Sequence, residues 1–269
     1  MNRRHFLYSA TALLGAGCVA PSPGSQRNLK LMSYNLHHGE GLDGRLDERR
    51  IGEIVRRAGP DLVTLQEVDR GAERTKRVDQ AAIYQEVTGM YSWYGAAMPF
   101  QGGEYGQVLL SRWPLGDPRV FRLPGTKGRE PRIATTAVVD VPGLGPVRWV
   151  GAHLDASRGD EDRWEQAGAL MAEFGRDTIP TLMGGDLNDT PESRVMQRLL
   201  AAGSGWQDTA GNAGAATNPA GAPKTRIDYI LTGPQGCWQV VESAVLPESV
   251  ASDHRPVIAT VRWLARSAR

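Results

Sequence analysis

Six short segments of the sequence place carboxylate, carboxamide or imidazole side chains at or just after an apolar stretch. The residues that these segments offer for chemistry are Asn35, Glu67, His153, Asp186, Asn188, Asp228, Asp253 and His254. Carboxylate and amide oxygens are hard ligands that suit Mg²⁺, which usually keeps several waters in protein sites. An imidazole beside a carboxylate can hold or transfer a proton near neutral pH. If the segments converge in space, they form a polar site able to bind a metal ion.

Each segment taken alone also fits an ordinary structural role. Asn35 could end a turn, and His153 could be a hydrogen-bonded core residue. Asp228 could form a structural ion pair with His254. All of these roles would have to hold together for the site to vanish, so six such segments in one chain favour a functional site.

The composition is that of a globular protein and excludes several classes of protein. The 269 residues are 41% hydrophobic and 23% charged, with a formal net charge of +1. The near-neutral charge gives no overall field typical of a nucleic-acid or membrane-surface binder. Two cysteines, Cys18 and Cys237, are too few for a disulfide scaffold or a thiolate zinc site. No apolar run reaches the ~20 residues of a membrane span.

The elements that must position the polar segments alternate between strands and helices. Strands are expected at residues 29–36, 61–66, 92–98, 107–111, 120–123, 133–139, 147–153, 181–185, 227–231, 238–245 and 256–263. Helices are expected at 47–58, 80–88 and 160–175, and a fourth is expected to start at Thr190-Pro191. Residues 203–223 are expected to be a loop. This order predicts a mixed α/β fold in which helices cover the sheets.

Capping residues, helix-breaking residues and the spacing of apolar residues predict the bounds and buried faces of the helices. Asp47 is a candidate N-cap of the first helix, and Gly59-Pro60 ends it. The buried face of the 160–175 helix is expected to consist of Ala167, Leu170, Met171 and Phe174. The strand–helix–strand order at 29–66 predicts a parallel pair of strands joined by a crossover helix.

Taken in order, the polar segments resemble the motifs of the endonuclease/exonuclease/phosphatase superfamily of DNase I-like enzymes. The matching motifs are Asn35, Gln66-Glu67, Ser111-Arg112, His153, Gly185-Asp186-Leu187-Asn188, Arg226-Ile227-Asp228-Tyr229 and Ser252-Asp253-His254-Arg255-Pro256. The resemblance implies one domain over residues 29–265. It also implies a four-layer α/β sandwich, in which two mixed β-sheets pack face to face with helices outside. The implied activity is metal-dependent hydrolysis of a phosphate ester.

The resemblance implies a metal site and a phosphate-side arginine. Glu67 would be the main metal carboxylate, with Asn35 beside it and Asp253 completing the metal environment. The expected cofactor is Mg²⁺, with Mn²⁺ as the alternative, and the number of metal ions stays open. Arg132 lies where many members carry a substrate-binding arginine.

The same resemblance implies the catalytic roles. Asp186 and Asn188 would position and deprotonate the attacking water, and Asn188 would also hold the phosphate. His254, oriented by Asp228, would hydrogen-bond a phosphoryl oxygen or share the role of the base. His153 would act near the leaving group. Whether Asp186 or His254 takes the proton stays open.

The substrate is less well defined than the site. Residues 112–132 carry six basic residues against two acidic ones, and Arg70, Arg74, Lys76 and Arg77 form a second basic cluster. Both clusters fit either a phosphate-binding rim or solvated loops. The segments at 37–41, 78–80 and 102–106 look like a subgroup of small exported bacterial members and the hydrolase domain of proteins associated with GPI-lipid remodelling.

Three functions follow from these observations. The favoured one is a Mg²⁺-dependent phosphodiesterase acting on a lipid head group or another small phosphodiester. The second is a secreted DNA or RNA endonuclease or exonuclease, for which the near-zero net charge is unhelpful. The third is a non-catalytic binding module on the same fold, which the full set of acidic and imidazole residues disfavours. The protein is expected to be a monomer.

The N-terminal residues have the layout of an export signal. Residues 1–20 combine Arg3-Arg4 with a short apolar stretch and small residues before Cys18. Arg3-Arg4 resembles a twin-arginine signal, and the residues before Cys18 resemble a lipobox. A buried N-terminal helix is the alternative. We expect export to the periplasm or cell envelope, a lipid anchor at Cys18 as the means of membrane association, and a flexible linker at 21–28.

Overall fold

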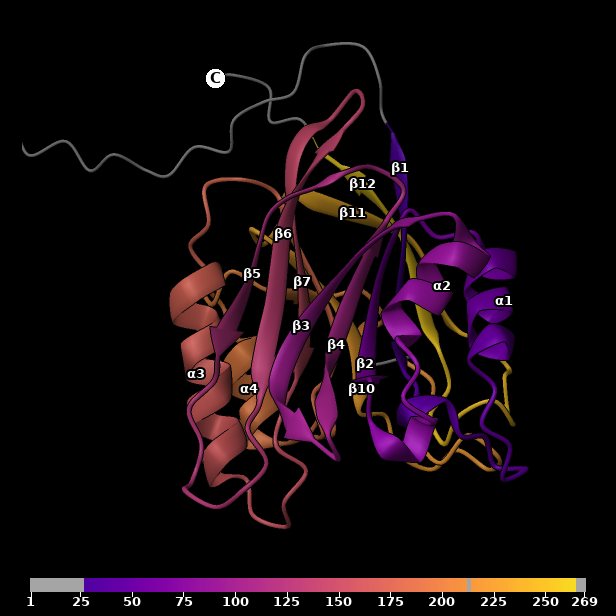
Figure 1. Cartoon of the computed structure of the whole chain (residues 1–269). Coiled ribbons are helices and arrows are strands. Elements are labelled where there is room, and N and C mark those ends of the chain that lie inside the picture. The colour runs from indigo at the N-terminus through magenta and orange to yellow at the C-terminus, as the bar shows by residue number, and fades with distance from the viewer. Residues whose placement is uncertain (1–26, 212–213, 265–269) are drawn as a thin grey trace, which may run out of the picture.

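Two mixed six-stranded sheets form the centre of the molecule (Figure 1). The computed structural model describes residues 27–211 and 214–264, so the expected signal at 1–20 and nearly all of the linker at 21–28 lie outside the described residues. The first sheet has the order β11 (Trp238–Val245), β12 (Val257–Trp263), β1 (Asn28–Asn35), β2 (Leu62–Arg70), β4 (Gly103–Ser111), β3 (Tyr91–Phe100). The second has the order β5 (Leu115–Arg122), β6 (Ile133–Val141), β7 (Gly145–His153), β8 (Thr181–Asp186), β10 (Asp228–Gly233), β9 (Gln207–Asp208). The β1–β2 and β7–β8 pairs are parallel, and all other neighbours are antiparallel.

Helices cover the outer face of each sheet and complete the expected four layers. Helices α1 (Glu48–Ala58) and α2 (Gln80–Thr88) lie on the first sheet, and α3 (Glu161–Phe174) and α4 (Arg194–Leu199) lie on the second (Figure 1). Short 3₁₀ turns lie at His37–Gly39 and Glu73–Thr75. None of the helices in the described ranges has the length and hydrophobicity needed to cross a membrane.

The expected caps of α1 are confirmed, but the expected start of α4 is wrong. The Asp47 side chain accepts a hydrogen bond from the Arg50 amide, and Gly59 ends α1 in the left-handed conformation. Helix α4 starts three residues after Pro191, because the Ser193 hydroxyl accepts from the Met196 amide and so caps the helix. Thr190 and Pro191 instead form a turn, in which the Ser193 amide donates to the Thr190 carbonyl.

Several strands also differ from the sequence-based expectation, and β4 and β5 begin at Gly103 and Leu115 rather than at 107 and 120. Strand β2 continues beyond Gln66 to Arg70, and its pairing with β4 is interrupted by an irregularity between Leu65 and Val68. The expected loop at 203–223 contains the two-residue strand β9, which pairs with β10 at the edge of the second sheet.

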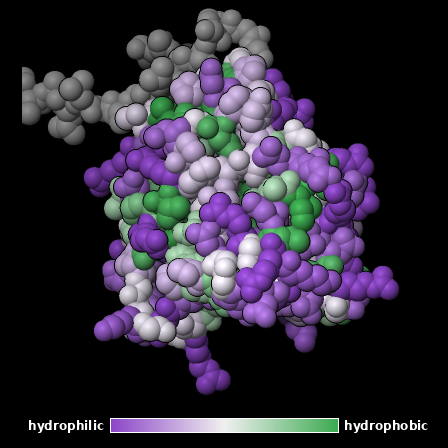
Figure 2. All heavy atoms as spheres, viewed as in Figure 1, coloured by the Kyte–Doolittle hydropathy of each residue, from purple (hydrophilic) through white to green (hydrophobic). Residues whose placement is uncertain are grey.

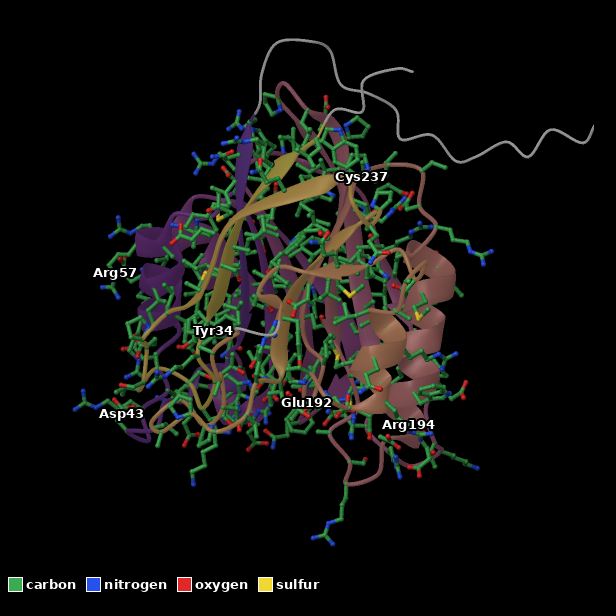
Figure 3. The ribbon with its side chains drawn as sticks, turned by 180° about the vertical axis from the view of Figure 1, so that it is seen from behind. Tyr34, Asp43, Arg57, Glu192, Arg194 and Cys237 are labelled. Carbon is green, nitrogen blue, oxygen red and sulfur yellow. The ribbon has the colours of Figure 1, made fainter. Side chains whose placement is uncertain are left out.

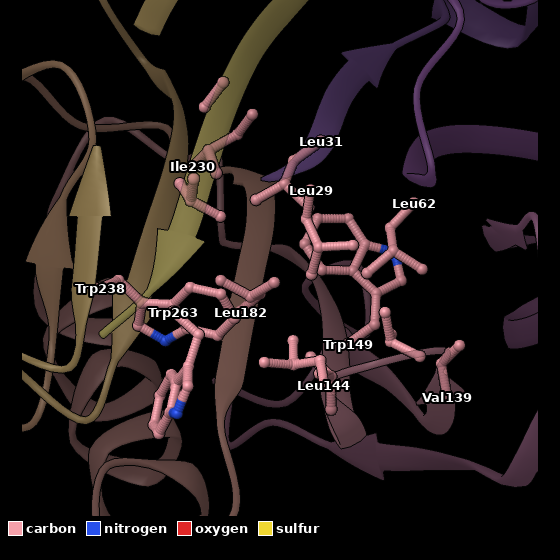
Figure 4. Packing of buried hydrophobic residues seen from close by; sticks show 14 of the residues in the cluster. Leu29, Leu31, Leu62, Val139, Leu144, Trp149, Leu182, Ile230, Trp238 and Trp263 are labelled. Atoms are coloured by element: carbon pink, nitrogen blue, oxygen red, sulfur yellow. The ribbon is translucent and has the colours of Figure 1, made fainter. Parts of the chain in front are cut away.

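The inward face of each central strand changes from apolar to polar along its length. On β1, Leu29 and Leu31 lie in the core between the sheets, whereas Met32 and Tyr34 point the other way, toward α1. The inter-sheet core also contains Leu62, Trp149, Leu182, Ile230, Trp238 and Trp263 (Figure 4). Because side chains alternate along a strand, the next inward positions of β1 are Ser33 and Asn35. The apolar core therefore ends about where the polar segments begin.

Small residues bring the two sheets close together just before that polar end. A Cβ on Gly151 would lie 2.3 Å from Thr64 Oγ1, and one on Gly184 would lie 2.6 Å from Thr64 Cγ2. Any larger residue at either glycine would push the sheets apart. The close approach fixes the spacing of the strand ends that carry the candidate site.

Candidate active site

The ends of β1, β2 and β8 meet at three side chains. The Asn35 amide donates to Glu67 Oε1 at 3.1 Å and to Asp186 Oδ2 at 3.0 Å. Asn35 and Asp186 come from different sheets, so this amide joins the two halves of the sandwich. In Figure 3, Asp43 and Glu192, which follow the carboxyl ends of β1 and β8, lie at one end of the molecule, and Cys237 lies at the other.

Glu67 reaches this cluster through strained backbone. Its φ of 59° lies in the left-handed region, at the irregularity in β2. A non-glycine residue in this conformation costs free energy, and such strain concentrates at functional sites. The irregularity turns the Glu67 side chain toward the space between the sheets. A regular strand that alternates from Gln66 would point it away.

His254 and Asp228 form a buried pair beside Asp186. His254 Nδ1 lies 2.9 Å from Asp228 Oδ2, and His254 Nε2 lies 3.7 Å from Asp186 Oδ2. Burial opposes protonation of the imidazole, but the Asp228 charge and hydrogen bond outweigh it and raise the pKa of His254 to about 10. His254 is therefore a cationic hydrogen-bond donor at neutral pH.

Burial raises the pKa values of the two carboxylates that Asn35 bridges. The pKa of Asp186 rises to about 7, because burial and then the Asp228 charge outweigh the opposing effect of His254. Burial also raises the pKa of Glu67, and the charge of Asp253 adds to this. The raised pKa values mean that nearby side chains stabilise the charged forms of Asp186 and Glu67 only in part.

His153 and Arg132 lie on the other side of Asp186. His153 Nε2 is 3.6 Å from Asp186 Oδ2, and Arg132 Nη1 lies 2.9 and 3.0 Å from the two ring nitrogens of His153. Burial, followed by the Arg132 charge, lowers the pKa of His153 well below its ordinary value, so this imidazole is neutral. Arg132 Nη1 also pairs with Glu130 at 2.9 Å.

Asn188 and Asp253 lie at the edges of the cluster. The Asn188 amide nitrogen of the backbone donates to Asp186 Oδ1 at 2.9 Å, and its side chain donates to the Leu154 carbonyl at 3.1 Å. The backbone of Asn188 is left-handed, with φ of 51°. Asp253 acts on Glu67 and His254 through its charge but forms no hydrogen bond with either side chain. The structure thus brings every predicted site residue to one end of the sandwich.

The donor set at this end fits a divalent cation. Among the described residues, no lysine or arginine forms an ion pair with Glu67 or Asp186, although both carboxylates are largely buried. A hard cation would supply the missing positive charge, and Asn35, Glu67 and Asp253 are the residues that would hold it. Ligand atoms of Asp186, Asp228 and His254 also lie within 4.8 Å of one another. Because Asp228 already binds the protonated His254, we interpret that trio as a proton-holding network.

The two basic clusters are more neutral in the structure than in the sequence. Five of their arginines form ion pairs: Arg70 with Glu104, Arg74 with Asp69, Arg112 with Asp61, Arg129 with Asp162 and Arg132 with Glu130. Arg74 also stacks over the Phe100 ring, with 4.5 Å from guanidinium carbon to ring centroid. The clusters therefore offer fewer cations to a ligand than their composition suggests.

Two residues of the site were not identified from the sequence as site residues. The Ser252 hydroxyl donates to the Asn35 carbonyl at 2.7 Å and accepts from the His254 amide at 3.2 Å, which joins the β1 end to the His254 loop. Its place before Asp253-His254 was the available signal. Tyr105 lines a cavity of about 10 Å³ together with Arg132 and His153. Its segment, 102–106, resembles a subgroup of the family, but nothing in that segment assigns a chemical role to Tyr105.

Comparison with known proteins identifies the fold and the family. The model of the endonuclease/exonuclease/phosphatase family matches residues 32–254. An endonuclease/exonuclease/phosphatase from Beutenbergia cavernae DSM 12333 is similar in structure, with 28% identity over 88% of this chain and 72% of that chain, and a TM-score of 0.71. No curated protein sequence matches the chain.

More distant structures share the fold. A mannosyl-6-phosphatase from Bacteroides thetaiotaomicron VPI-5482 has 20% identity over 87% of this chain and 99% of that chain, with a TM-score of 0.71. The human Nocturnin catalytic domain with a bound sulfate anion has 18% identity over 88% of this chain and 95% of that chain, also with a TM-score of 0.71. Together with the family match over most of its length, the four-layer fold and the site at its end, this shows that the chain belongs to the endonuclease/exonuclease/phosphatase family.

Proposed function

We propose that the protein is an exported, Mg²⁺-dependent phosphodiesterase that acts on a lipid head group or another small phosphodiester. Members of the family are hydrolases of phosphoester bonds and generally use a divalent metal. The observation that carries the proposal is the convergence of side chains at one end of the sandwich. These are two carboxylates, one amide that bridges them, and two imidazoles, of which one is protonated and the other neutral.

In this proposal the residues divide the work by their charge. Asp186, with its pKa near 7, accepts the proton of the attacking water, and Asn188 helps to hold the phosphate. His254 stays protonated because of Asp228 and donates to a phosphoryl oxygen, where negative charge grows in the transition state. Arg132 donates to the phosphate from the His153 side.

A divalent metal would supply Lewis-acid stabilisation of the phosphoryl oxygen. Glu67, Asn35 and Asp253 would hold it. Among these, Glu67 is fixed in place by the Asn35 amide and by its strained backbone. His153 is neutral and lies beside Arg132, so it would donate a hydrogen bond from its ring N–H to the leaving group rather than a proton.

Charge pairing favours a small substrate over a nucleic acid. Tracking a nucleic-acid backbone requires several unpaired cations along a surface. Five arginines of the two basic clusters are instead paired with carboxylates, although Lys76, Arg77, Arg119, Arg122 and Lys127 form no ion pair in the described part of the chain. Figure 2 shows hydrophobic residues only in separate small patches on the viewed face, which supports a monomer.

A two-substrate assay tests the proposed activity. The purified protein with Mg²⁺ is incubated with phosphatidylinositol or sphingomyelin vesicles, and in parallel with supercoiled plasmid. Release of the phosphorylated head group without plasmid nicking supports the proposal. Nicking without head-group release supports the nuclease, and inactivity of both the wild type and His254→Ala on any phosphodiester supports the binding module.

The expected localisation of the protein is also part of the proposal. Residues 1–20 would direct export, and a lipid on Cys18 would hold the mature protein at a membrane. Mass spectrometry of the mature N-terminus tests this: a diacylated Cys18 is expected, and an unmodified Met1 would contradict both export and anchoring. Replacing Cys18 with Ala should move the protein from the membrane fraction to the soluble fraction.

A further inference from the structure

The first two turns of α3 bury polar side chains where an amphipathic helix normally buries apolar ones. Asp162 and Arg163 are each 7% exposed and Gln166 is 1% exposed, whereas the later turns bury apolar residues as the sequence predicts. Burying charged and amide groups costs free energy unless they are hydrogen-bonded. Their partners therefore show what this end of the helix does.

Arg163 binds two loops at once. Its Nε donates to Asp189 Oδ2 at 3.0 Å, and its Nη1 donates to the carbonyls of Asp155 at 3.0 Å and Ser157 at 2.8 Å. The Asp155–Ser157 loop directly follows His153 on β7. Asp189 lies in the loop that directly follows Asp186 on β8. One guanidinium group thus binds both the loop that follows β7 and the loop that follows the neighbouring strand β8.

Asp162 and Gln166 bind a third loop, the one that leads into Arg132. Asp162 accepts from the Thr126 amide at 3.1 Å and from the Thr126 hydroxyl at 2.8 Å. The Gln166 amide donates to the Pro124 carbonyl at 3.0 Å, and its oxygen accepts from the Asp155 amide at 2.8 Å. All three loops are therefore bound to two adjacent turns of one helix.

We propose that Arg163 is a positioning residue for catalysis, which sets the relative placement of His153 and Asp186. His153 and Asp186 are paired neighbours on the parallel strands β7 and β8, and their side chains lie 3.6 Å apart. The Asn188 side chain already links the loops that follow them, through the Leu154 carbonyl. Arg163 adds a second link on the outer side of the same two loops. The inference rests on the proposed function in so far as it gives His153 and Asp186 chemical roles.

The three contacts require an arginine. A guanidinium group presents several donors in a rigid plane, so it can reach a carboxylate and two carbonyls together. A lysine at position 163 keeps the positive charge beside Asp189 but offers one flexible ammonium group. The variant Arg163→Lys therefore retains the charge and loosens the loops.

The test compares Arg163→Lys with Arg194→Lys. Arg194 is a matched control, because it pairs with Asp160 at the start of α3, at 2.7 Å, with a half-exposed side chain. With bis(4-nitrophenyl) phosphate and Mg²⁺, we expect Arg163→Lys to lower kcat by about 10²-fold with little change in KM, since a small misplacement of catalytic groups costs this much. Arg194→Lys should stay within twofold of the wild type.

The leaving group distinguishes positioning from a loss of folded protein. Poor leaving groups depend more on hydrogen bonds to the departing oxygen, so the ratio of kcat for bis(4-nitrophenyl) phosphate to kcat for diphenyl phosphate should rise at least threefold in Arg163→Lys. A smaller fraction of folded enzyme lowers both rates equally and leaves this ratio unchanged. An unchanged ratio together with near-wild-type kcat overturns the inference and leaves the proposed function intact.

Hydrogen exchange tests the same inference without a substrate. In Arg163→Lys, the amides of residues 154–159 and 187–190 should exchange faster together, while those of β8 keep their protection. Unaltered exchange in either loop overturns the inference. If exchange in Arg163→Lys is faster in both loops but the wild type hydrolyses neither ester, the proposed function fails and the link between the loops stands.

Discussion

The space between the two sheets has an apolar end and a polar end, and the same strands build both. On β1, Leu31 packs between the sheets at the apolar end, and Asn35, on the same face, joins Glu67 to Asp186 at the polar end. The apolar cluster also contains Trp238 and Trp263, whose rings contact each other edge to face (Figure 4). Only three residues of one strand thus separate a packing position from a chemical one.

The two ends differ in what they do for stability. At the apolar end, burial itself stabilises the fold. At the polar end, burial raises the pKa values of Glu67 and Asp186, and Glu67 and Asn188 have left-handed backbones. Buried charge and strained backbone both cost free energy. The free energy gained by burial at the apolar end therefore offsets the cost of the buried charges and strained backbone at the polar end.

The largest effect is expected from Asp186→Asn. The amide has nearly the same shape as the carboxylate but cannot accept a proton from water, so the turnover rate should fall by about 10²–10⁴-fold. The melting temperature should stay the same or rise, because a buried charge is removed. Rate and melting temperature are measured on the same sample. A normal rate, or a parallel fall in rate and melting temperature, would contradict the prediction that Asp186 serves catalysis rather than stability.

Leu31→Ala should have the opposite effect. Removing this buried side chain should lower the free energy of unfolding by about 2–5 kcal/mol. The rate per folded molecule should not change, because Leu31 lies in the apolar cluster between the sheets, which contains no predicted site residue. Denaturant unfolding and a turnover assay well below the melting temperature check this. A large loss of turnover in fully folded Leu31→Ala would show that the two ends are coupled.

Metal addition should stabilise the protein through the polar end alone. A ligand that binds only the folded state at a hundred times its dissociation constant adds about 2.7 kcal/mol. Saturating Mg²⁺ should therefore raise the melting temperature of the wild type, and a chelator should reverse the rise and abolish turnover. Glu67→Gln should lose most of this response. An equal response in Leu31→Ala and Glu67→Gln would place the metal elsewhere.

Asp228→Asn should give a smaller effect that depends on pH. Without the Asp228 charge, burial pulls the pKa of His254 down from about 10. If it falls to about 6.5, the protonated fraction at pH 8 falls about 30-fold but changes little at pH 6. The loss of turnover should therefore grow as the pH rises from 6 to 8. A pH-independent loss would mean that Asp228 acts without setting the charge of His254.

Much of the fold and the site could be predicted from the sequence, because both depend on local patterns. Alternation along the strands and the residues at their ends predicted sheets covered by helices and a polar site at the strand ends, whereas the four layers followed from the resemblance to the family. The irregularity that turns Glu67 inward was not predictable, since it depends on pairing with β4. The start of α4 was wrong because the Ser193 cap competes with Pro191.

The polar contacts of α3 could not be predicted either. Asp162 and Arg163 look like solvent-exposed residues in the sequence, because charged residues at the start of a helix are usually exposed. Their partners lie in loops up to 36 residues away along the chain. Such contacts are a property of the assembled fold.

The most direct test of the polar end is His254→Ala, measured for single-turnover rate and melting temperature on the same sample. Removing a preorganised donor to the phosphoryl oxygen typically costs about 10²–10³-fold in rate. We predict a loss of at least this size on the best phosphodiester substrate, with a melting curve close to that of the wild type. Near-normal hydrolysis by a normally folded His254→Ala protein would contradict the assignment of the active site.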